Sequence, residues 1–135
     1  MMVMIDRARL ESTSYAALRI VAGFMFLWHG AQKLFGVPAA SAMPAMFTQK
    51  WIGGVIELVA GGLVMLGLFT RPAAFLASGT MAVAYLQFHW KGALGANLLP
   101  IVNKGELAVL YCFVFLLIWA RGAGSFSIDR QLRRD

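Results

Sequence analysis

Six polar side chains occur within or at the ends of long apolar stretches, where ionisable and amide groups are uncommon. They are His29, Lys33, Glu57, Gln87, His89 and Glu106. Such groups can hydrogen-bond the oxygen atoms of a small molecule and can exchange protons with it. The aromatic residues suited to pack against a ring are Phe26, Trp28, Trp51 and Phe88. Together these residues predict a binding site for a lipid-soluble small molecule, and none of them is assigned a catalytic role.

No other pattern in the sequence points to a known type of catalytic or metal site. The histidines and glutamates are too far apart in sequence for two of them to hold one metal from the same helix turn. Phosphate-binding loops, dinucleotide-binding glycine motifs, and zinc-protease and serine-hydrolase signatures are all missing. The single cysteine, Cys112, lies within an apolar run and is expected to be a small buried hydrophobe. We therefore expect no metal site and no covalently bound cofactor.

The composition is that of an integral membrane protein. Of the 135 residues, 60% are hydrophobic and 13% are charged, whereas a soluble domain has about 25% charged residues. A single domain of this size has too little interior to bury so many apolar side chains, so lipid must cover the rest. The net charge of +6 comes from single basic residues that mostly stand where apolar stretches end. This pattern is typical of membrane topology and argues against binding to nucleic acid.

Four apolar stretches are each close to the roughly 20 residues that a membrane-spanning helix needs. They lie approximately at residues 15–36, 51–69, 72–90 and 105–121, and a polar tail follows at 122–135. Open strands are excluded because unpaired backbone groups are too costly in lipid, and a barrel is excluded because runs such as residues 107–118 do not alternate between apolar and polar residues. The first stretch contains Arg19 and Lys33, which a cleaved signal peptide would lack, so we expect it to be retained. The predicted fold is an all-α integral membrane protein, a bundle of four transmembrane helices that forms one domain over residues 1–135.

The basic residues predict the orientation of this bundle. With four spans, both termini and the short connection around residues 70–71 share one side of the membrane. That side carries Arg7, Arg9, Arg71, Arg121, Arg130, Arg133 and Arg134, with Arg19 nearby. The opposite side carries Lys33, Lys50, Lys91 and Lys104. Because the loops with more basic residues stay in the cytoplasm, both termini are predicted to be cytoplasmic.

The polar side chains are predicted to lie at one height in the membrane. At a rise of about 1.5 Å per residue, all six fall in the outer third of the bundle. Glu57 is the deepest, and Lys33 or a histidine is the expected partner for its charge. Gly53, Glu57 and Gly61 are spaced by four residues. Glycines on that face would let a neighbouring helix approach and would bury Glu57 away from lipid.

Several of these residues also have an interpretation that involves no ligand. Lys33 could snorkel to the headgroups, and His89 could be an ordinary interface residue. Glu106 could serve only to stabilise a helix N-terminus. Arg19 is expected either to snorkel or to pair with the C-terminal tail.

Four short patterns follow one another along the chain. The first helix carries Leu18-Arg19 and then the run from His29 to Gly36, which has the form HGxQKLFG. The second carries Gly54, Glu57 and Gly61-Gly62, and then the run from Gly67 to Arg71. The segment from Asn103 to Tyr111 has the form NxGExxxxY, and the tail from Gly122 to Asp129 has the form GxGxxSxD. In this order the patterns resemble the DoxX family of small bacterial membrane proteins.

The resemblance implies a four-helix protein of the bacterial inner membrane. Relatives in that family include a membrane subunit of a thiosulfate:quinone oxidoreductase, and others are linked to thiol-redox complexes or to quinone and catechol resistance. Together with the polar residues in the outer third of the predicted bundle, the resemblance favours a membrane subunit of a quinone- or thiol-linked redox system. The chain would be at most the membrane subunit of an oxidoreductase.

In this hypothesis a quinone is the candidate ligand, bound in the outer-leaflet half of the bundle. The expected partners are the lipid bilayer, a soluble oxidoreductase subunit and further copies of the chain. Two alternatives are a non-enzymatic scaffold that anchors a soluble oxidoreductase, and a small transporter.

Overall fold

The computed structural model describes residues 5–39 and 42–133, and every regular element among them is helical. The prediction of an all-α fold is therefore confirmed. The long helices are α1 (Arg7–Phe35), α2 (Gln49–Leu66), α3 (Thr70–Ala84) with its π-helical continuation η1 (Tyr85–Trp90), and α5 (Glu106–Arg121). The short ones are η2 (Gly95–Leu98), α4 (Pro100–Asn103) and α6 (Ile128–Gln131). Arg134, which belongs to the predicted basic tail, lies outside the described residues.

Capping residues set the ends of the first two helices, and the pattern of apolar residues does not include them. α1 begins well before residue 15, because the side chain of Asp6 accepts hydrogen bonds from the backbone of its first turn. Gly36 ends α1 and Gly67 ends α2, both in the left-handed conformation, with φ of 68° and 67°. The second helix, predicted at 51–69, therefore ends a little earlier than its apolar stretch.

The third predicted helix, 72–90, changes its geometry along its length. It starts as α3 and continues from Tyr85 as η1, which has the wider turns of a π-helix. η1 ends at Lys91, whose backbone is left-handed with φ of 58°. The segment that follows folds into η2 and α4 before α5 begins at Glu106. These short elements could not be predicted, because they are too short to show a periodic pattern.

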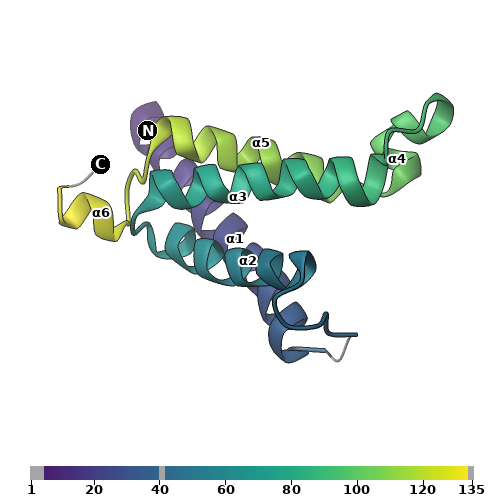
Figure 1. Ribbon diagram of the computed structural model, residues 1–135. Helices are drawn as coiled ribbons and strands as arrows, with labels where there is room; N and C mark the ends of the chain where they lie inside the picture. The colour runs from purple at the N-terminus through teal and green to yellow at the C-terminus, as the bar shows by residue number, and fades with distance from the viewer. Residues whose placement is uncertain (1–4, 40–41, 134–135) are drawn as a thin grey trace.

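The long helices form two antiparallel pairs, α1 with α2 and α3 with α5. The pairs lie together where α2 turns into α3, and they diverge toward the opposite end (Figure 1). We call the end that holds the chain termini and the α2–α3 turn the tail end, and the opposite end the cavity end. The divergence of the pairs is the feature of the fold that makes room for the candidate site.

Glycines bring the backbones of α1 and α2 unusually close. A Cβ atom at Gly30 would lie 2.4 Å from the backbone nitrogen of Leu58, and one at Gly61 would lie 2.6 Å from that of Leu27. These distances leave no room for a side chain, so the helices are in backbone contact. The sequence predicted such an approach through Gly61 but placed Gly53 on the same face. Gly53 instead has open space around it and lines the cavity.

The tail end is tied together by Arg19, whose side chain is fully buried. Its guanidinium group donates hydrogen bonds to the backbone carbonyl of Val64 in α2 and to those of Ala123, Ser125 and Phe126 in the tail. The prediction that Arg19 pairs with the tail is confirmed, and the side chain does not snorkel to the surface.

The tail is also fixed to the bundle through Asp129 in α6. Its carboxylate accepts hydrogen bonds from the backbone N–H groups of Phe69 and Thr70, at 3.0 and 2.9 Å, and from the Thr70 hydroxyl at 2.8 Å. Tyr15 of α1 donates a further hydrogen bond to the carbonyl of Gly122. Over its described part, the segment predicted as a tail is therefore an ordered element of the bundle.

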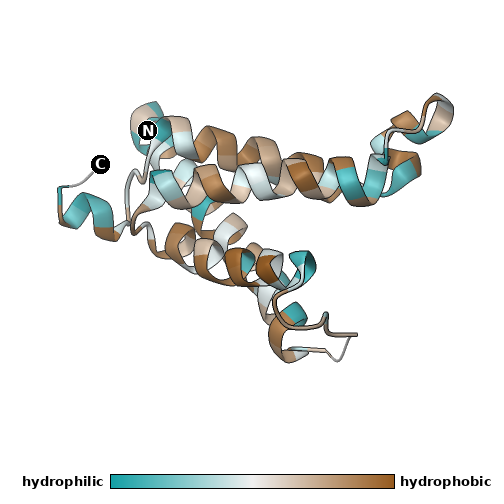
Figure 2. Ribbon diagram, viewed as in Figure 1, coloured by the Kyte–Doolittle hydropathy of each residue, from teal (hydrophilic) through white to brown (hydrophobic). Residues whose placement is uncertain are grey.

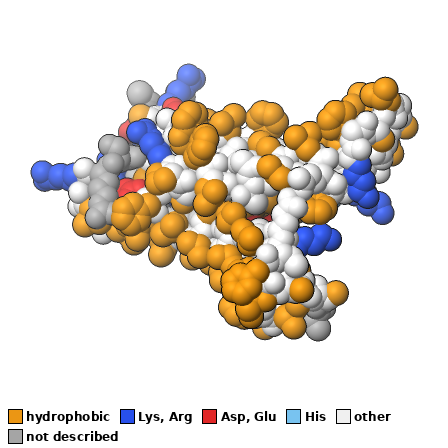
Figure 3. Space-filling model, viewed as in Figure 1, with side chains coloured by type: hydrophobic (Ala, Val, Ile, Leu, Met, Phe, Trp, Pro, Cys, Tyr) orange, Lys and Arg blue, Asp and Glu red, His pale blue; other side chains and the backbone are white. Residues whose placement is uncertain are grey.

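Large apolar side chains cover much of the outside of the bundle (Figure 3). Leu110 and Phe113 on α5 and Phe75 on α3 are each at least 60% exposed. Within the described chain, α2 is the one helix that is long and apolar enough to cross a membrane by itself, with a mean hydropathy of 1.3. In Figure 2 hydrophilic colours gather on α6, near the N-terminus and at the far end of α3. An exterior of this kind is suited to lipid.

Candidate functional site

A cavity of about 950 Å³ lies at the cavity end, between the two helix pairs. Figure 3 shows a hollow between two arms of the surface, one formed around α4 and one at the end of α1. Residues of α1, α2, α3, η1 and α5 line the cavity, and most of its wall is apolar. Its polar lining residues are His29, Lys33, Gln49, Lys50, Glu57, Thr80, His89, Lys91, Lys104 and Tyr111. This size and composition are typical of a site for a small organic molecule.

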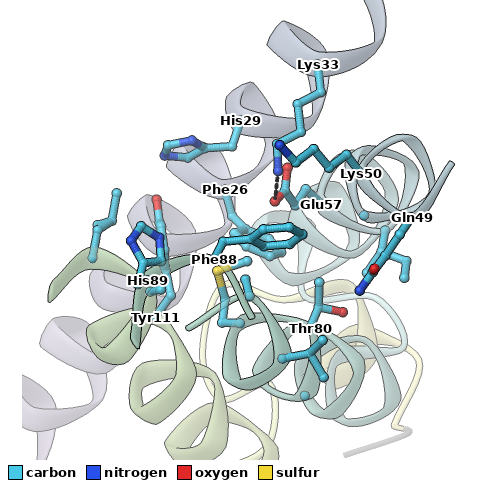
Figure 4. A pocket seen from close by; sticks show the side chains of 18 of the residues that line it. Phe26, His29, Lys33, Gln49, Lys50, Glu57, Thr80, Phe88, His89 and Tyr111 are labelled. Atoms are coloured by element: carbon cyan, nitrogen blue, oxygen red, sulfur yellow. Dashed lines mark hydrogen bonds and ion pairs between the residues drawn. The ribbon is translucent and has the colours of Figure 1, made fainter. Parts of the chain in front are cut away.

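An ion pair between α1 and α2 forms the most buried polar contact of the cavity (Figure 4). Lys33 Nζ lies 2.7 Å from Oε1 of Glu57. The Glu57 side chain is 3% exposed and the Lys33 side chain 39%, so the ammonium group reaches toward the surface from a buried carboxylate. The close contact of the two backbones at Gly30 brings these residues together. Lys33, one of the partners expected for Glu57, is thus the partner observed.

Two buried polar atoms in the cavity have no hydrogen-bond partner within the described part of the chain. They are the second carboxylate oxygen of Glu57, Oε2, and the hydroxyl oxygen of Tyr111 in α5. Both residues line the cavity, and Tyr111 is 6% exposed. A buried polar group without a partner costs about 1–3 kcal/mol, so a bound molecule that supplies the missing hydrogen bond recovers that energy. The site therefore offers one strong acceptor and one group that can donate or accept.

The two histidines of the cavity come from opposite helix pairs. The ring of His29 in α1 meets Tyr111 edge-on, with 5.9 Å between the ring centroids. His89 in η1 stacks on Tyr85, and its Nδ1 lies 3.3 Å from the backbone carbonyl of Asn103. Because a carbonyl can only accept, Nδ1 donates the hydrogen in this contact.

The mouth of the cavity is basic and is bridged on one side by side chains. Gln49, at the start of α2, donates a hydrogen bond to Gln87 in η1. The Lys50 ammonium group lies 5.1 Å from the centroid of the Phe88 ring, a cation–π contact between the same two elements. Two further lysines at the opening are Lys91 and Lys104. This concentration of positive charge attracts molecules that carry oxygen atoms with negative or partial negative charge.

The residues that the sequence selects as site candidates divide into two groups. Those that line the cavity are Phe26, His29, Lys33, Glu57, Phe88 and His89. Those outside its lining are Trp28, Trp51, Gln87 and Glu106. Both tryptophans pack instead against a phenylalanine close by in sequence. Gln87 stands at the rim in its contact with Gln49, and Glu106 is exposed.

Tyr111 is the buried polar residue of the site that the sequence does not predict, and the lining residues Gln49, Lys50, Thr80, Lys91 and Lys104 are also not predicted as site residues. A single tyrosine within an apolar helix gives no sign of the cavity, although its place in the NxGExxxxY pattern was a signal that could have found it. Within the described ranges, no three His, Cys, Asp or Glu side chains come together as metal ligands.

Comparison with known proteins adds family relationships to this geometry. The sequence matches the DoxX family over residues 14–90. It is 42% identical to an uncharacterised protein of Haemophilus influenzae, over 86% of this chain and 88% of that protein. It is 30% identical to inner membrane protein YqjF of Escherichia coli, over 93% and 97% of the two chains. An uncharacterised membrane protein of Mycobacterium tuberculosis is 29% identical, over 90% and 82%. No solved structure matches the chain.

Proposed function

Because the chain belongs to the DoxX family and is a protein of the bacterial inner membrane, we propose that it spans the membrane four times and binds a lipid-soluble quinone in its cavity. In this proposal it is the membrane subunit of a quinone- or thiol-linked redox system whose soluble oxidoreductase partner exchanges the electrons. The observation that carries the proposal is the pair of polar atoms, on Glu57 and Tyr111, that have no partner among the described residues and lie inside a mostly apolar cavity.

The lengths and surfaces of the helices support four spans. α1 has 29 residues, more than the roughly 20 that cross the hydrocarbon core. α3 and η1 run on without a break and together have 21 residues, 15 in α3 and 6 in η1. α5 is shorter, with 16 residues, and would require local thinning of the bilayer or snorkelling side chains at its ends. The exposed apolar side chains of both pairs would then face lipid, and the arginine-rich tail end would face the cytoplasm.

A quinone suits the cavity in both of its redox forms. Its ring is flat and apolar, and it carries oxygen atoms at opposite edges. In the oxidised form, a carbonyl oxygen would accept a hydrogen bond from the Tyr111 hydroxyl. In the reduced form, a hydroxyl group would donate one to Glu57 Oε2. Because each form satisfies a buried group of the protein, the site would hold the molecule through a redox cycle.

The residues of the chain would also handle protons. Oxidation of a quinol releases two protons together with two electrons. Glu57 is positioned to accept one of these protons from a hydroxyl group hydrogen-bonded to it, and the contact with Lys33 leads from the buried carboxylate toward the surface. The second proton would leave from the other hydroxyl group to water at the mouth of the cavity. The electrons would pass to the partner oxidoreductase. If the partner instead reduces a bound quinone, electrons and protons would move in the opposite direction.

Quinone binding by the purified protein tests this proposal. We expect Tyr111→Phe to weaken binding of an oxidised short-chain ubiquinone analogue by about tenfold, and Glu57→Gln to weaken binding of its reduced, quinol form by about tenfold, because each substitution removes the protein's share of one buried hydrogen bond. Glu106→Gln is the matched control, since it makes the same change at an exposed position outside the cavity lining. Binding that is equal in the parent protein and the three variants would refute the proposal.

The two alternative functions make different predictions. A scaffold would rely on the basic tail, so reversing the charge of the exposed Arg133 would release a bound oxidoreductase and leave quinone binding intact.

A transporter would require a route through the tail end, where Arg19 and Asp129 fasten the tail across the helices. Flux of a quinone analogue or of protons into liposomes would support that function.

A further inference from the structure

A second hollow, of about 360 Å³, lies at the tail end and is lined by basic and hydroxyl-bearing residues. Its lining consists of Arg9, Ser12 and Thr13 from α1, and of Ser125, Phe126 and Arg130 from the tail. We call it the tail-end hollow. It shares no lining residue with the large cavity.

The hollow is formed where one face of α1 meets the folded tail. Ser12 and Thr13 follow Arg9 by three and four positions, so the three side chains share a helix face. On the other side, Arg130 donates a hydrogen bond to the Ser125 hydroxyl at 2.7 Å, and that hydroxyl also bonds to the Ser12 hydroxyl. Over residues 5–39 and 42–133, neither Arg9 nor Arg130 forms an ion pair. In the part of the chain that the structure describes, two guanidinium groups therefore line the hollow without an ion-pair partner.

This set of groups is suited to bind phosphate. Guanidinium groups bind phosphate oxygens through two parallel charge-assisted hydrogen bonds, and hydroxyl groups add neutral ones. None of the described residues that line the hollow is acidic, so no group there repels an anion. Phe126 supplies the one apolar part of the wall.

The height of the hollow along α1 favours the phosphate group of a lipid over a free phosphate ion. The apolar stretch of the first helix starts near residue 15. At a rise of about 1.5 Å per residue, Arg9, Ser12 and Thr13 stand about 3–9 Å outside the hydrocarbon core. The headgroup layer, which holds the lipid phosphates, extends over about 5–8 Å on each side of that core.

The conformation of Phe126 gives a separate indication of contact with lipid. Its backbone is left-handed, with φ of 54°, and its side chain is 74% exposed. Bulky residues rarely adopt this conformation, which commonly marks a functional position. Its carbonyl is held by Arg19, so the ring is directed outward from a fixed backbone. An aromatic ring beside the headgroups is well placed to lie against the acyl chain of a lipid whose phosphate occupies the hollow.

We propose that the tail-end hollow binds the phosphate group of an anionic phospholipid from the cytoplasmic leaflet. A phosphate held by both Arg9 and Arg130 joins α1 to the tail and stabilises the tail end. The proposal uses the predicted orientation of the bundle but is independent of quinone binding in the large cavity.

Lipid binding by the full-length protein in detergent tests the proposal. Delipidated protein is mixed with equal amounts of phosphatidylglycerol or phosphatidylcholine, and bound lipid is counted by native mass spectrometry. We expect phosphatidylglycerol to bind and to raise Tm, and R9Q/R130Q to weaken its binding by about tenfold or more. The matched control, R7Q/R133Q, removes two exposed arginines of the tail end that lie outside the hollow, and should keep most of the binding.

Two outcomes would overturn the proposal. Equal losses in R9Q/R130Q and R7Q/R133Q would show that surface charge in general attracts the lipid. Inorganic phosphate that raises Tm as much as phosphatidylglycerol would show that the ligand is a free ion. A second variant, Phe126→Ser, leaves the charge unchanged and is expected to weaken phosphatidylglycerol binding while leaving any effect of inorganic phosphate unaltered.

Discussion

The two ends of the bundle each bury a charged side chain, and they satisfy that charge in different ways. At the tail end, Arg19 donates hydrogen bonds to four backbone carbonyls of α2 and the tail. At the cavity end, Glu57 has Lys33 on one oxygen and no partner from the described residues on the other. Burial of a charge therefore does not by itself indicate a binding site. The indication comes from hydrogen-bonding capacity that the protein leaves unused.

The packing of the helices follows the same division. Toward the tail end, Val64, Phe115 and Ile118 are fully buried and fill the space between the helices. At the cavity end, a Cβ atom added to Gly53 or Gly79 would meet no atom within 4 Å, and both glycines line the cavity. We infer that the closely packed tail end supplies most of the stability of the fold. The cavity end contributes less to stability, and its open space can hold a ligand.

Arg19→Gln is the variant expected to reduce the free energy of unfolding most. If it had no effect, the contrast between the two ends of the bundle would be wrong. The shorter amide cannot reach the carbonyls of both α2 and the tail, which leaves several buried acceptors without a donor. We expect a loss of about 3 kcal/mol or more in the free energy of unfolding, measured by denaturation in detergent. Arg71→Gln is the control, because Arg71 is exposed and makes one long hydrogen bond of 3.5 Å. Similar losses in both variants would contradict the assignment of stability to the Arg19 contacts.

Two glycine substitutions in the helix pair α1–α2 sharpen the contrast between close packing and open space. A Cβ atom at Gly30 would clash with the backbone near Leu58, whereas one at Gly53 would meet nothing within 4 Å. We expect Gly30→Ala to cost about 2 kcal/mol and to weaken ligand binding, because separated helices also separate Lys33 from Glu57. Gly53→Ala should be neutral or stabilising, since alanine favours a helix more than glycine does. Thermal unfolding of the two variants measures both effects, and a reversed order would contradict the structure.

Asp129→Asn tests how strongly the tail is fastened to the α2–α3 turn. The amide oxygen can replace part of the carboxylate's role, but its charge and one acceptor atom are lost at Phe69 and Thr70. We expect a loss of about 1–2 kcal/mol and faster proteolysis of the tail. Asp6→Asn makes the same change at the N-cap of α1, where asparagine caps as well as aspartate, and should have almost no effect. Equal stability of the two variants would show that the tail is not fastened through Asp129.

The sequence predicts the features of the fold that depend on neighbouring residues. Long apolar runs predicted the helical class and the four main helices, although the start of α1 lies well before its apolar stretch. The fold of the tail depends on distant partners instead. Asp129 bonds to residues about sixty positions away, at Phe69 and Thr70, and no local pattern reports such a contact.

Rise along a helix can be calculated from the sequence, whereas the direction in which each side chain points relative to the other helices cannot. His29 and Trp28 lie at nearly the same height, yet neighbouring residues of a helix point about 100° apart. The cavity therefore receives His29, while Trp28 packs against Phe24. Glu106 and Tyr111 differ in both respects, because five residues along α5 change the height as well as the face, and Tyr111 alone of the two lines the cavity. Which face meets the cavity depends on how the pairs α1–α2 and α3–α5 are set against each other, and apolar periodicity does not contain that information.

Glu57→Gln should have the smallest effect on stability and completes the contrast with Arg19→Gln. The Lys33 ammonium group is partly exposed and can turn to water when its partner loses its charge, so we expect the free energy of unfolding to change by about 1 kcal/mol or less. The same substitution is expected to reduce binding of the reduced, quinol form by about tenfold, because it replaces the carboxylate acceptor that has no partner among the described residues. Unfolding and binding measured on one preparation compare the two effects directly. A large loss of stability would mean that Glu57 resembles Arg19 as a structural charge, and the distinction between the two ends of the bundle would no longer hold.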